Sequence, residues 1–80
     1  MIEMWRWELK PGEVFESSGH PAGTLELFHV EQGTLKVKVD QAEIIIIEGN
    51  SAIARTDVPH QYINNGKDNV VFTMTVAEFH

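Results

Sequence analysis

Turn-forming residues interrupt this chain at short intervals and leave no stretch with a convincing helical period. Between the interruptions, apolar residues alternate with polar ones, which is the period of two expected of half-buried β-strands. Short strands repeating every eight to twelve residues or so are typical of a single all-β barrel or sandwich. We therefore expect the 80 residues, 1–80, to form one domain.

The alternation predicts which residues each strand covers and which way its side chains point. The first strand places Trp5, Trp7 and Leu9 on one face, and the last places Val70, Phe72, Met74 and Val76 on one face. The predicted strands cover residues 4–9, 13–17, 25–30, 34–39, 43–48, 51–55, 60–64 and 70–79.

The run Ile44 to Ile47 consists wholly of a β-branched residue and is too short for an independent helix. We interpret it as a strand covered on both faces. Glu43 and Glu48 flank the run, as charges do where a strand must be kept from pairing at an open edge.

Two groups of apolar residues are expected to pack. The predicted interior comprises Phe15, Phe28, Leu35, Val37, Ile53, Phe72 and Met74. A second group is interpreted as core or sheet-packing residues, with a dimer interface as the alternative: Trp5, Trp7, Leu25 and Leu27.

A chain of 80 residues buries only about 60 to 65% of the surface that its unfolded form exposes, so its stability alone is slender. The absence of cysteine excludes disulfides, thiolate zinc sites and cysteine nucleophiles. The remaining supports are a metal ion or a second subunit, and we expect a homodimer.

Charge and hydropathy exclude two classes of partner. A net charge of -6, from twelve acidic and six basic residues, argues against direct contact with nucleic acid. No run approaches the roughly 20 apolar residues that span a bilayer, and the start lacks the pattern of a signal peptide. We expect a cytoplasmic protein without membrane contact.

One carboxylate is predicted to point into the apolar interior. In an extended strand Glu26, Phe28 and Val30 share a face, and burying a carboxylate is costly unless a partner neutralises it. His60 is the best candidate partner, and Tyr62 follows it on the same face of a short strand. Imidazole and carboxylate groups that face one cavity are typical of a first-row metal site or a polar ligand pocket.

Two stretches resemble the paired motifs of the cupin superfamily. In the first, His20, Glu26 and Gly33 match the family pattern, while Ala22 stands where the pattern has a second histidine. In the second, the matching residues are Gly49, His60 and Asn64, while the usual proline and inner glycine are replaced by Arg55 and Asp57.

With these departures from the family pattern, the two motifs are similar to those of one branch of that superfamily, the C-terminal sensor domain of helix-turn-helix transcriptional regulators. The stretches that carry the resemblance are PGEVFESSGHPAGTLELFHVEQGTLKVKVD and DVPHQYINNG. The resemblance implies a small antiparallel jelly-roll barrel of about eight short strands that binds a small effector, sometimes with a metal, and pairs with a second copy. The chain holds no helix-turn-helix segment, so it is expected to be an excised sensor domain or a free-standing small cupin.

The candidate metal ligands are His20, Glu26 and His60, a set of two imidazoles and one carboxylate. Zinc, nickel, manganese and iron all accept such nitrogen and oxygen ligands. The alternative is a vestigial site, in which Glu26 and His60 form a buried hydrogen-bonded pair and no metal binds.

Three further residues are candidates for ligand contact, each with a structural alternative. Tyr62 and Asn64 share the inward face with His60, although a buried phenol needs a hydrogen-bond partner in any case and Asn64 can close the following turn. Arg55 is expected near the mouth of the barrel, where it meets a carboxylate effector or remains a solvated charge. His29 lies on the face opposite Glu26 and is expected at the surface.

The sequence therefore predicts a domain that senses an amino acid or a short organic acid for a transcriptional regulator. The competing hypothesis is a small metal-dependent cupin enzyme of the dioxygenase or isomerase type, because a three-ligand site with open positions is also a catalytic arrangement. A third is a structural dimerisation module.

Overall fold

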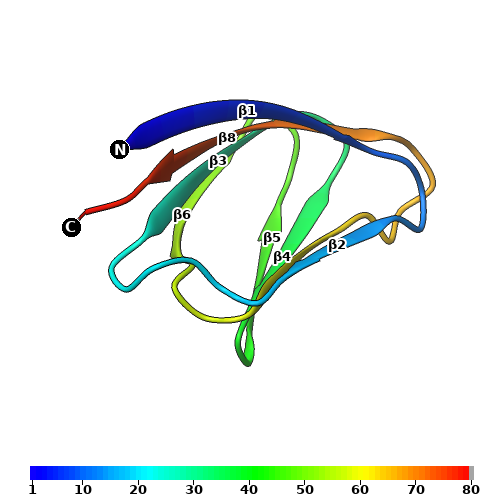
Figure 1. Cartoon of the computed structure of the whole chain (residues 1–80). Coiled ribbons are helices and arrows are strands. Elements are labelled where there is room, and N and C mark those ends of the chain that lie inside the picture. Colours follow the sequence, from blue (N-terminus) through cyan, green and yellow to red (C-terminus); the bar gives the residue numbers. More distant parts are fainter. Residues whose placement is uncertain (80) are drawn as a thin grey trace.

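The protein folds into two four-stranded antiparallel sheets that face each other (Figure 1). The computed structural model describes residues 1–79, and these contain strands and no helix. The strands are β1 (Ile2–Leu9), β2 (Val14–Ser17), β3 (Leu25–Gln32), β4 (Leu35–Val39), β5 (Ala42–Ile46), β6 (Ser51–Arg55), β7 (His60–Ile63) and β8 (Val70–Ala77). The predicted all-β jelly-roll fold is confirmed. Within the same residues there is no helix long and apolar enough to cross a membrane.

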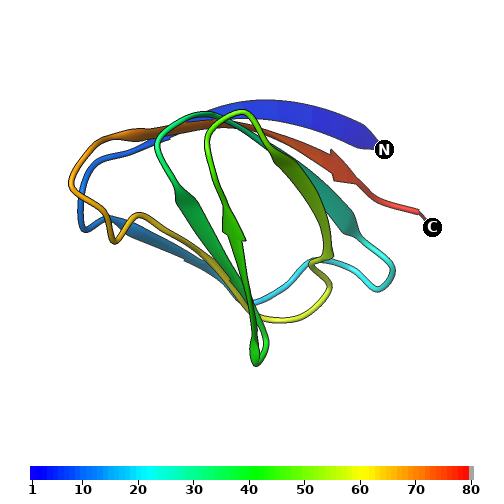
Figure 2. The same ribbon diagram turned by 180° about the vertical axis from the view of Figure 1, so that it is seen from behind.

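The chain passes from one sheet to the other at nearly every connection. One sheet has the order β1-β8-β3-β6 and the other the order β2-β7-β4-β5, so only β4 and β5 form a hairpin within one sheet. As a consequence, the β2–β3 and β6–β7 connections approach each other at one end of the molecule, as the view from behind also shows (Figure 2).

The core lies between the two sheets and follows the predicted alternation. On β1 the side chains of Trp7 and Leu9 turn inward, and on β3 those of Glu26, Phe28 and Val30 do the same. The buried cluster comprises Leu9, Phe28, Val30, Leu35, Val37, Ile46, Ala54, Tyr62, Val70, Phe72, Met74 and Val76. Five of the seven residues predicted for the interior are therefore buried.

The isoleucine run is a strand, but the prediction that both of its faces are covered is wrong. Ile45 and Ile47 are 60% and 56% exposed, whereas Ile46 is buried and Ile44 half-buried. Each of the two facing sheets meets the core on one face only, so along β5 the side chains of Ile44 and Ile46 turn inward and that of Ile45 turns outward.

The prediction of an interior position is also wrong for Ile53, and it holds only in part for Phe15. Ile53 lies on the edge strand β6 with its side chain on the outer face, 58% exposed. Phe15 is 42% exposed because it lies on β2, which is an edge strand of the sheet β2-β7-β4-β5. Leu27 and Trp5 are exposed as well, so neither is a core residue.

Gly33 marks the sharp turn between β3 and β4, and no other residue fits there. Its φ angle is +79°, in the region that side chains with a Cβ rarely adopt. A Cβ at this position would lie 2.6 Å from the carbonyl oxygen of Asn69. The tight turn sends the chain directly from β3 into the opposite sheet.

Candidate metal site and adjoining cavity

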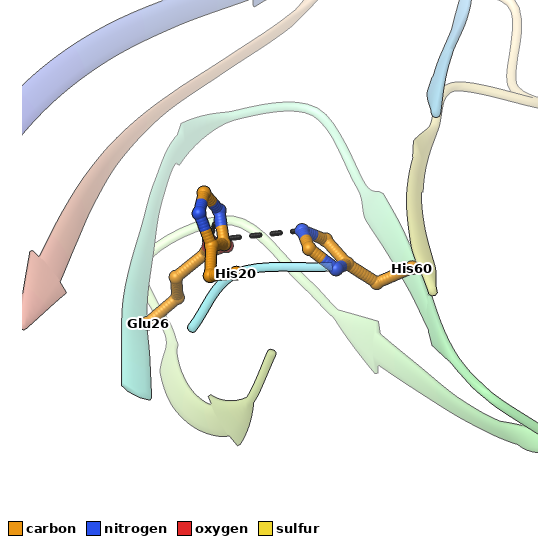
Figure 3. Close-up of side chains that lie close together, drawn as sticks. All are labelled: His20, Glu26 and His60. Atoms are coloured by element: carbon orange, nitrogen blue, oxygen red, sulfur yellow. Dashed lines mark ion pairs between the residues drawn. The ribbon is translucent and has the colours of Figure 1, made fainter. Parts of the chain in front are cut away.

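Three side chains from three different elements meet inside one end of the barrel (Figure 3). His20 comes from the β2–β3 loop, Glu26 from β3 and His60 from the first position of β7. Each offers one ligand atom, and these atoms lie within 4.8 Å of one another. The structure thus brings together the three residues that the sequence singled out.

Hydrogen bonds between two loops hold His20 in place. The His20 N–H donates to the Thr56 carbonyl at 3.0 Å, and the Thr56 N–H donates to the Thr24 carbonyl at 3.0 Å. The Gly23 N–H donates to Oδ2 of Asp57 at 2.8 Å. The loop that carries His20 is therefore fastened to the segment that leads into His60.

Asp57 is held in its charged form by these contacts. The hydrogen bond from the Gly23 N–H, followed by the one from Arg55, lowers the pKa of the Asp57 carboxyl below its ordinary value of 3.8. Arg55 Nε lies 2.9 Å from Asp57 Oδ2, and its side chain is mostly exposed. Arg55 thus contacts the loop from outside and does not join His20, Glu26 and His60.

Glu26 is completely buried and is contacted on both of its oxygens. Its Oε1 accepts a hydrogen bond from the Tyr62 hydroxyl. Its Oε2 lies 2.8 Å from His20 Nε2 and 3.7 Å from His60 Nε2. Burial, and then the adjacent carboxylate, raises the pKa of Tyr62 well above its ordinary value, so the phenol remains a donor.

His60 directs a free nitrogen toward Glu26. Its Nδ1 lies 2.8 Å from the carbonyl oxygen of Val58, which can only accept, so Nδ1 carries a proton. In the neutral ring Nε2 is then a lone pair. His60 Nε2 is buried without a hydrogen-bond partner among the described residues, whereas the buried Glu26 Oε2 is contacted by His20 Nε2 at 2.8 Å.

A divalent cation would satisfy both of these atoms. Two acceptors that face each other across 3.7 Å need a proton or a cation between them. A histidine ligand commonly donates its other ring N–H to a backbone carbonyl, as His60 does to Val58. The ligand set fits a first-row metal, with positions left open because Ala22 is an exposed loop residue that offers no donor atom.

A cavity of about 320 Å³ opens beside this cluster. Its lining joins the inward faces of β1 and β8 to β2, to Tyr62 on β7 and to His20. The lining residues are Glu3, Trp5, Trp7, Phe15, Ser17, His20, Tyr62, Met74, Val76 and Glu78. Glu3 and Glu78 were not among the residues predicted from the sequence to contact a ligand, although Glu3 falls in the same alternating row as Trp5 and Trp7.

The remaining candidates lie away from this cavity. Asn64 is buried, and its amide donates to the carbonyls of Leu9 at 2.9 Å and Asp68 at 2.8 Å. Its oxygen accepts from the Gly66 N–H at 3.0 Å, so the side chain closes the turn before β8. His29 is exposed on the outer face, with its Nδ1 2.7 Å from the Ser51 hydroxyl.

Comparison with known proteins links this fold to one group. A family profile described as "Cupin domain" matches residues 5–76. No curated protein matches the chain significantly.

Solved structures give close matches over nearly the whole chain. The cupin domain of an XRE family transcriptional regulator from Enterobacter cloacae superposes with a TM-score of 0.91 and 26% identity, covering 99% of this chain and 83% of that one. An HTH_3 family transcriptional regulator from Vibrio cholerae gives 0.90 and 28%, covering 99% of this chain and 44% of that one. A de novo designed double-stranded β-helix shares the fold alone, with a TM-score of 0.75 at 15% identity, covering 94% and 99%.

Proposed function

Because the chain belongs to the cupin family and resembles the cupin domains of helix-turn-helix regulators, we propose that it is a metal-assisted, small-molecule-binding sensor domain. The observation that carries this proposal is the convergence of three potential ligand atoms, from His20, Glu26 and His60, at a point where His60 Nε2 is buried without a hydrogen-bond partner among the described residues. A metal ion bound there would satisfy that nitrogen together with the Glu26 carboxylate, which His20 contacts at 2.8 Å.

The ion in this proposal is zinc, nickel, manganese or iron, held by His20, Glu26 and His60. When bound, such an ion supplies open coordination positions for an oxygen or nitrogen atom of the ligand. The protein contributes the orientation, because the Val58 carbonyl sets the His60 ring and the Tyr62 hydroxyl sets the carboxylate.

The cavity beside the cluster is the place we propose for the effector. Its volume of about 320 Å³ suits a small molecule such as an amino acid or a short organic acid better than a nucleotide. Tyr62 lines the cavity and donates a hydrogen bond to Glu26 of the cluster, so a ligand in the cavity would lie against a residue that holds Glu26.

The pairing that we propose uses the outer face of the β1-β8-β3-β6 sheet. Met4 lies opposite Thr75, Thr75 opposite Leu27, and Leu27 opposite Ile53, so one row of side chains crosses all four strands. We call Met4, Leu27 and Ile53, all large apolar residues that are exposed, the outer strip. An exposed row of this kind, apolar at every strand but β8, where Thr75 stands, favours a second copy of the chain as its partner.

In this proposal the effector biases the arrangement of two paired domains, and DNA-binding segments elsewhere in the regulator respond to it. The domain itself carries a net charge of -6, which favours partners other than nucleic acid. The readout therefore passes through the pairing of the domains.

Metal analysis combined with thermal melts tests this proposal. We expect about one metal ion per chain, and a melting temperature that falls with chelator and recovers when metal is restored, because binding to the folded state stabilises it by mass action. His20→Ala and His60→Ala should each lose the chelator-sensitive shift. His29→Ala, which removes an exposed imidazole on the outer face, should keep it.

A wild-type melt that does not move with chelator or with any of the four metals would remove the ion from the proposal. Loss of the shift in His29→Ala to the same degree as in His20→Ala would contradict the assignment of the ligands.

A further inference from the structure

Glu3 is an acidic residue on the inward face of β1, and none of the residues that the structure describes forms an ion pair with it. It lies opposite Val76, in the row that continues with Trp5 opposite Met74 and Trp7 opposite Phe72. Its side chain is half-buried and makes no hydrogen bond or ion pair with any of residues 1–79. A carboxylate in such a position calls for a positively charged partner.

The cavity that Glu3 lines has aromatic walls. Trp7 and Phe15 meet edge to face with ring centroids 4.8 Å apart, and Trp7 and Tyr62 meet in the same way at 5.3 Å. Phe15 and Tyr62 stack at 5.6 Å. The faces of such rings carry negative potential and attract cations, most strongly for tryptophan.

Two carboxylates line the cavity, those of Glu3 and Glu78, and no lysine or arginine side chain does. The one ammonium nearby, that of Met1, donates to the Glu78 carbonyl at 2.9 Å and is not part of the lining. Anionic ligands are therefore disfavoured at this mouth, whereas a cation is favoured by the carboxylates and by the rings. Met74 and Val76 supply an apolar part of the lining.

We propose that this cavity binds a small organic ammonium compound. The ammonium group lies between Glu3 and the aromatic rings, the apolar body lies along Met74 and Val76, and the other end faces His20. This inference rests on the proposed function, since it concerns the ligand of the same cavity. It narrows that ligand to molecules with a positive charge, so an amino acid or amine fits and a simple organic acid does not.

Matched pairs of a cation and its neutral isostere test the inference. Choline differs from 3,3-dimethyl-1-butanol, and benzylamine from benzyl alcohol, mainly in charge. In calorimetric titrations of the whole chain, we expect each cation to bind about tenfold more tightly than its neutral partner. Glu3→Gln should remove most of that preference. Glu8→Gln, on the exposed outward face of the same strand, should leave it unchanged.

The titrations are repeated once with zinc and once with chelator, so that binding of the organic cation can be distinguished from any effect of a bound metal ion. A preference for the cation that persists in chelator supports the inference even if the metal proposal fails. Equal binding of both members of a pair, tighter binding of butyrate or benzoate, or no binding of any probe at millimolar concentration overturns it, even where metal stabilises the protein. If Glu3→Gln does not fold, the outcome is decided by the wild type alone, from the ratio of the dissociation constants of each neutral compound and its matching cation.

Discussion

The tyrosine hydroxyl at position 62 determines how a fully buried carboxylate is tolerated. Glu26 Oε1 accepts from this phenol, while Glu26 Oε2 faces the two histidines. Since burial raises the pKa of Tyr62, the phenol keeps its proton and the donor is present throughout the ordinary pH range. Oε1 is thus occupied by the phenol, whereas Oε2, beside the two histidines, is the oxygen that would bind a cation.

We expect Tyr62→Phe to lower the free energy of unfolding by about 1–3 kcal/mol, because it leaves a buried carboxylate oxygen without its donor. Urea denaturation of the chelated protein measures this. In a Glu26→Gln background the same change should cost less, because a neutral acceptor forms a weaker bond than a charged one. Equal losses in the two backgrounds would show that the cost arises from packing and not from this hydrogen bond.

At the scale of the elements, the two loops that carry His20 and lead to His60 act as one unit through Asp57. Its Oδ2 accepts from the Gly23 N–H and lies beside Arg55 Nε. Because these contacts lower the pKa of Asp57 in the folded protein, the charged form contributes stability above the unfolded value of 3.8. That contribution is lost as the pH falls through the lower folded value.

We therefore expect Asp57→Asn to be less stable than the wild type near neutral pH, and the difference to shrink once the pH falls below 3.8. Urea denaturation across this range, with chelator present, measures it. Glu43 also has a lowered pKa, owing to Lys36, but it is present in both proteins and cancels in the difference. A difference that stays constant with pH would contradict the role assigned to the Asp57 charge.

Much of this organisation is visible in the sequence, because alternation alone tells which side chains turn inward. That is why Glu26 was assigned to the interior together with Phe28 and Val30. Alternation does not reveal which of the two faces of a strand meets the core where both carry apolar or small residues, and this is why the predictions for Ile45 and Ile53, whose side chains lie on outer faces, are wrong. Nor does it reveal hydrogen bonds between loops, such as that from Gly23 to Asp57, which depend on how the connections meet in space.

At the scale of the whole molecule, the two sheets differ in what they show to their surroundings. The outer strip crosses one sheet from Met4 through Leu27 to Ile53. Ile45 and Ile47, equally apolar, lie on the edge strand of the other sheet. In the proposed dimer the outer strip forms the interface, whereas Ile45 and Ile47 take no part in it.

We expect the wild type to sediment as a dimer and Leu27→Lys to sediment as a monomer, because a charge in the middle of the outer strip opposes its burial. Ile45→Lys introduces the same charge at a similarly exposed apolar position on the other sheet and should remain a dimer. Analytical ultracentrifugation over a range of concentrations measures this. A monomeric wild type, or dissociation caused only by Ile45→Lys, would refute the pairing through this face.

The beginning and the end of the described chain are joined at one place: Met1 donates to the carbonyl of Glu78 at 2.9 Å, and the Glu78 N–H donates back to Met1 at 2.8 Å. Glu3 and Glu78, next to that junction, both line the cavity. A molecule bound there would contact both β1, which carries Glu3, and the segment that directly follows β8. We therefore expect its release to be coupled to local opening of these two neighbouring strands.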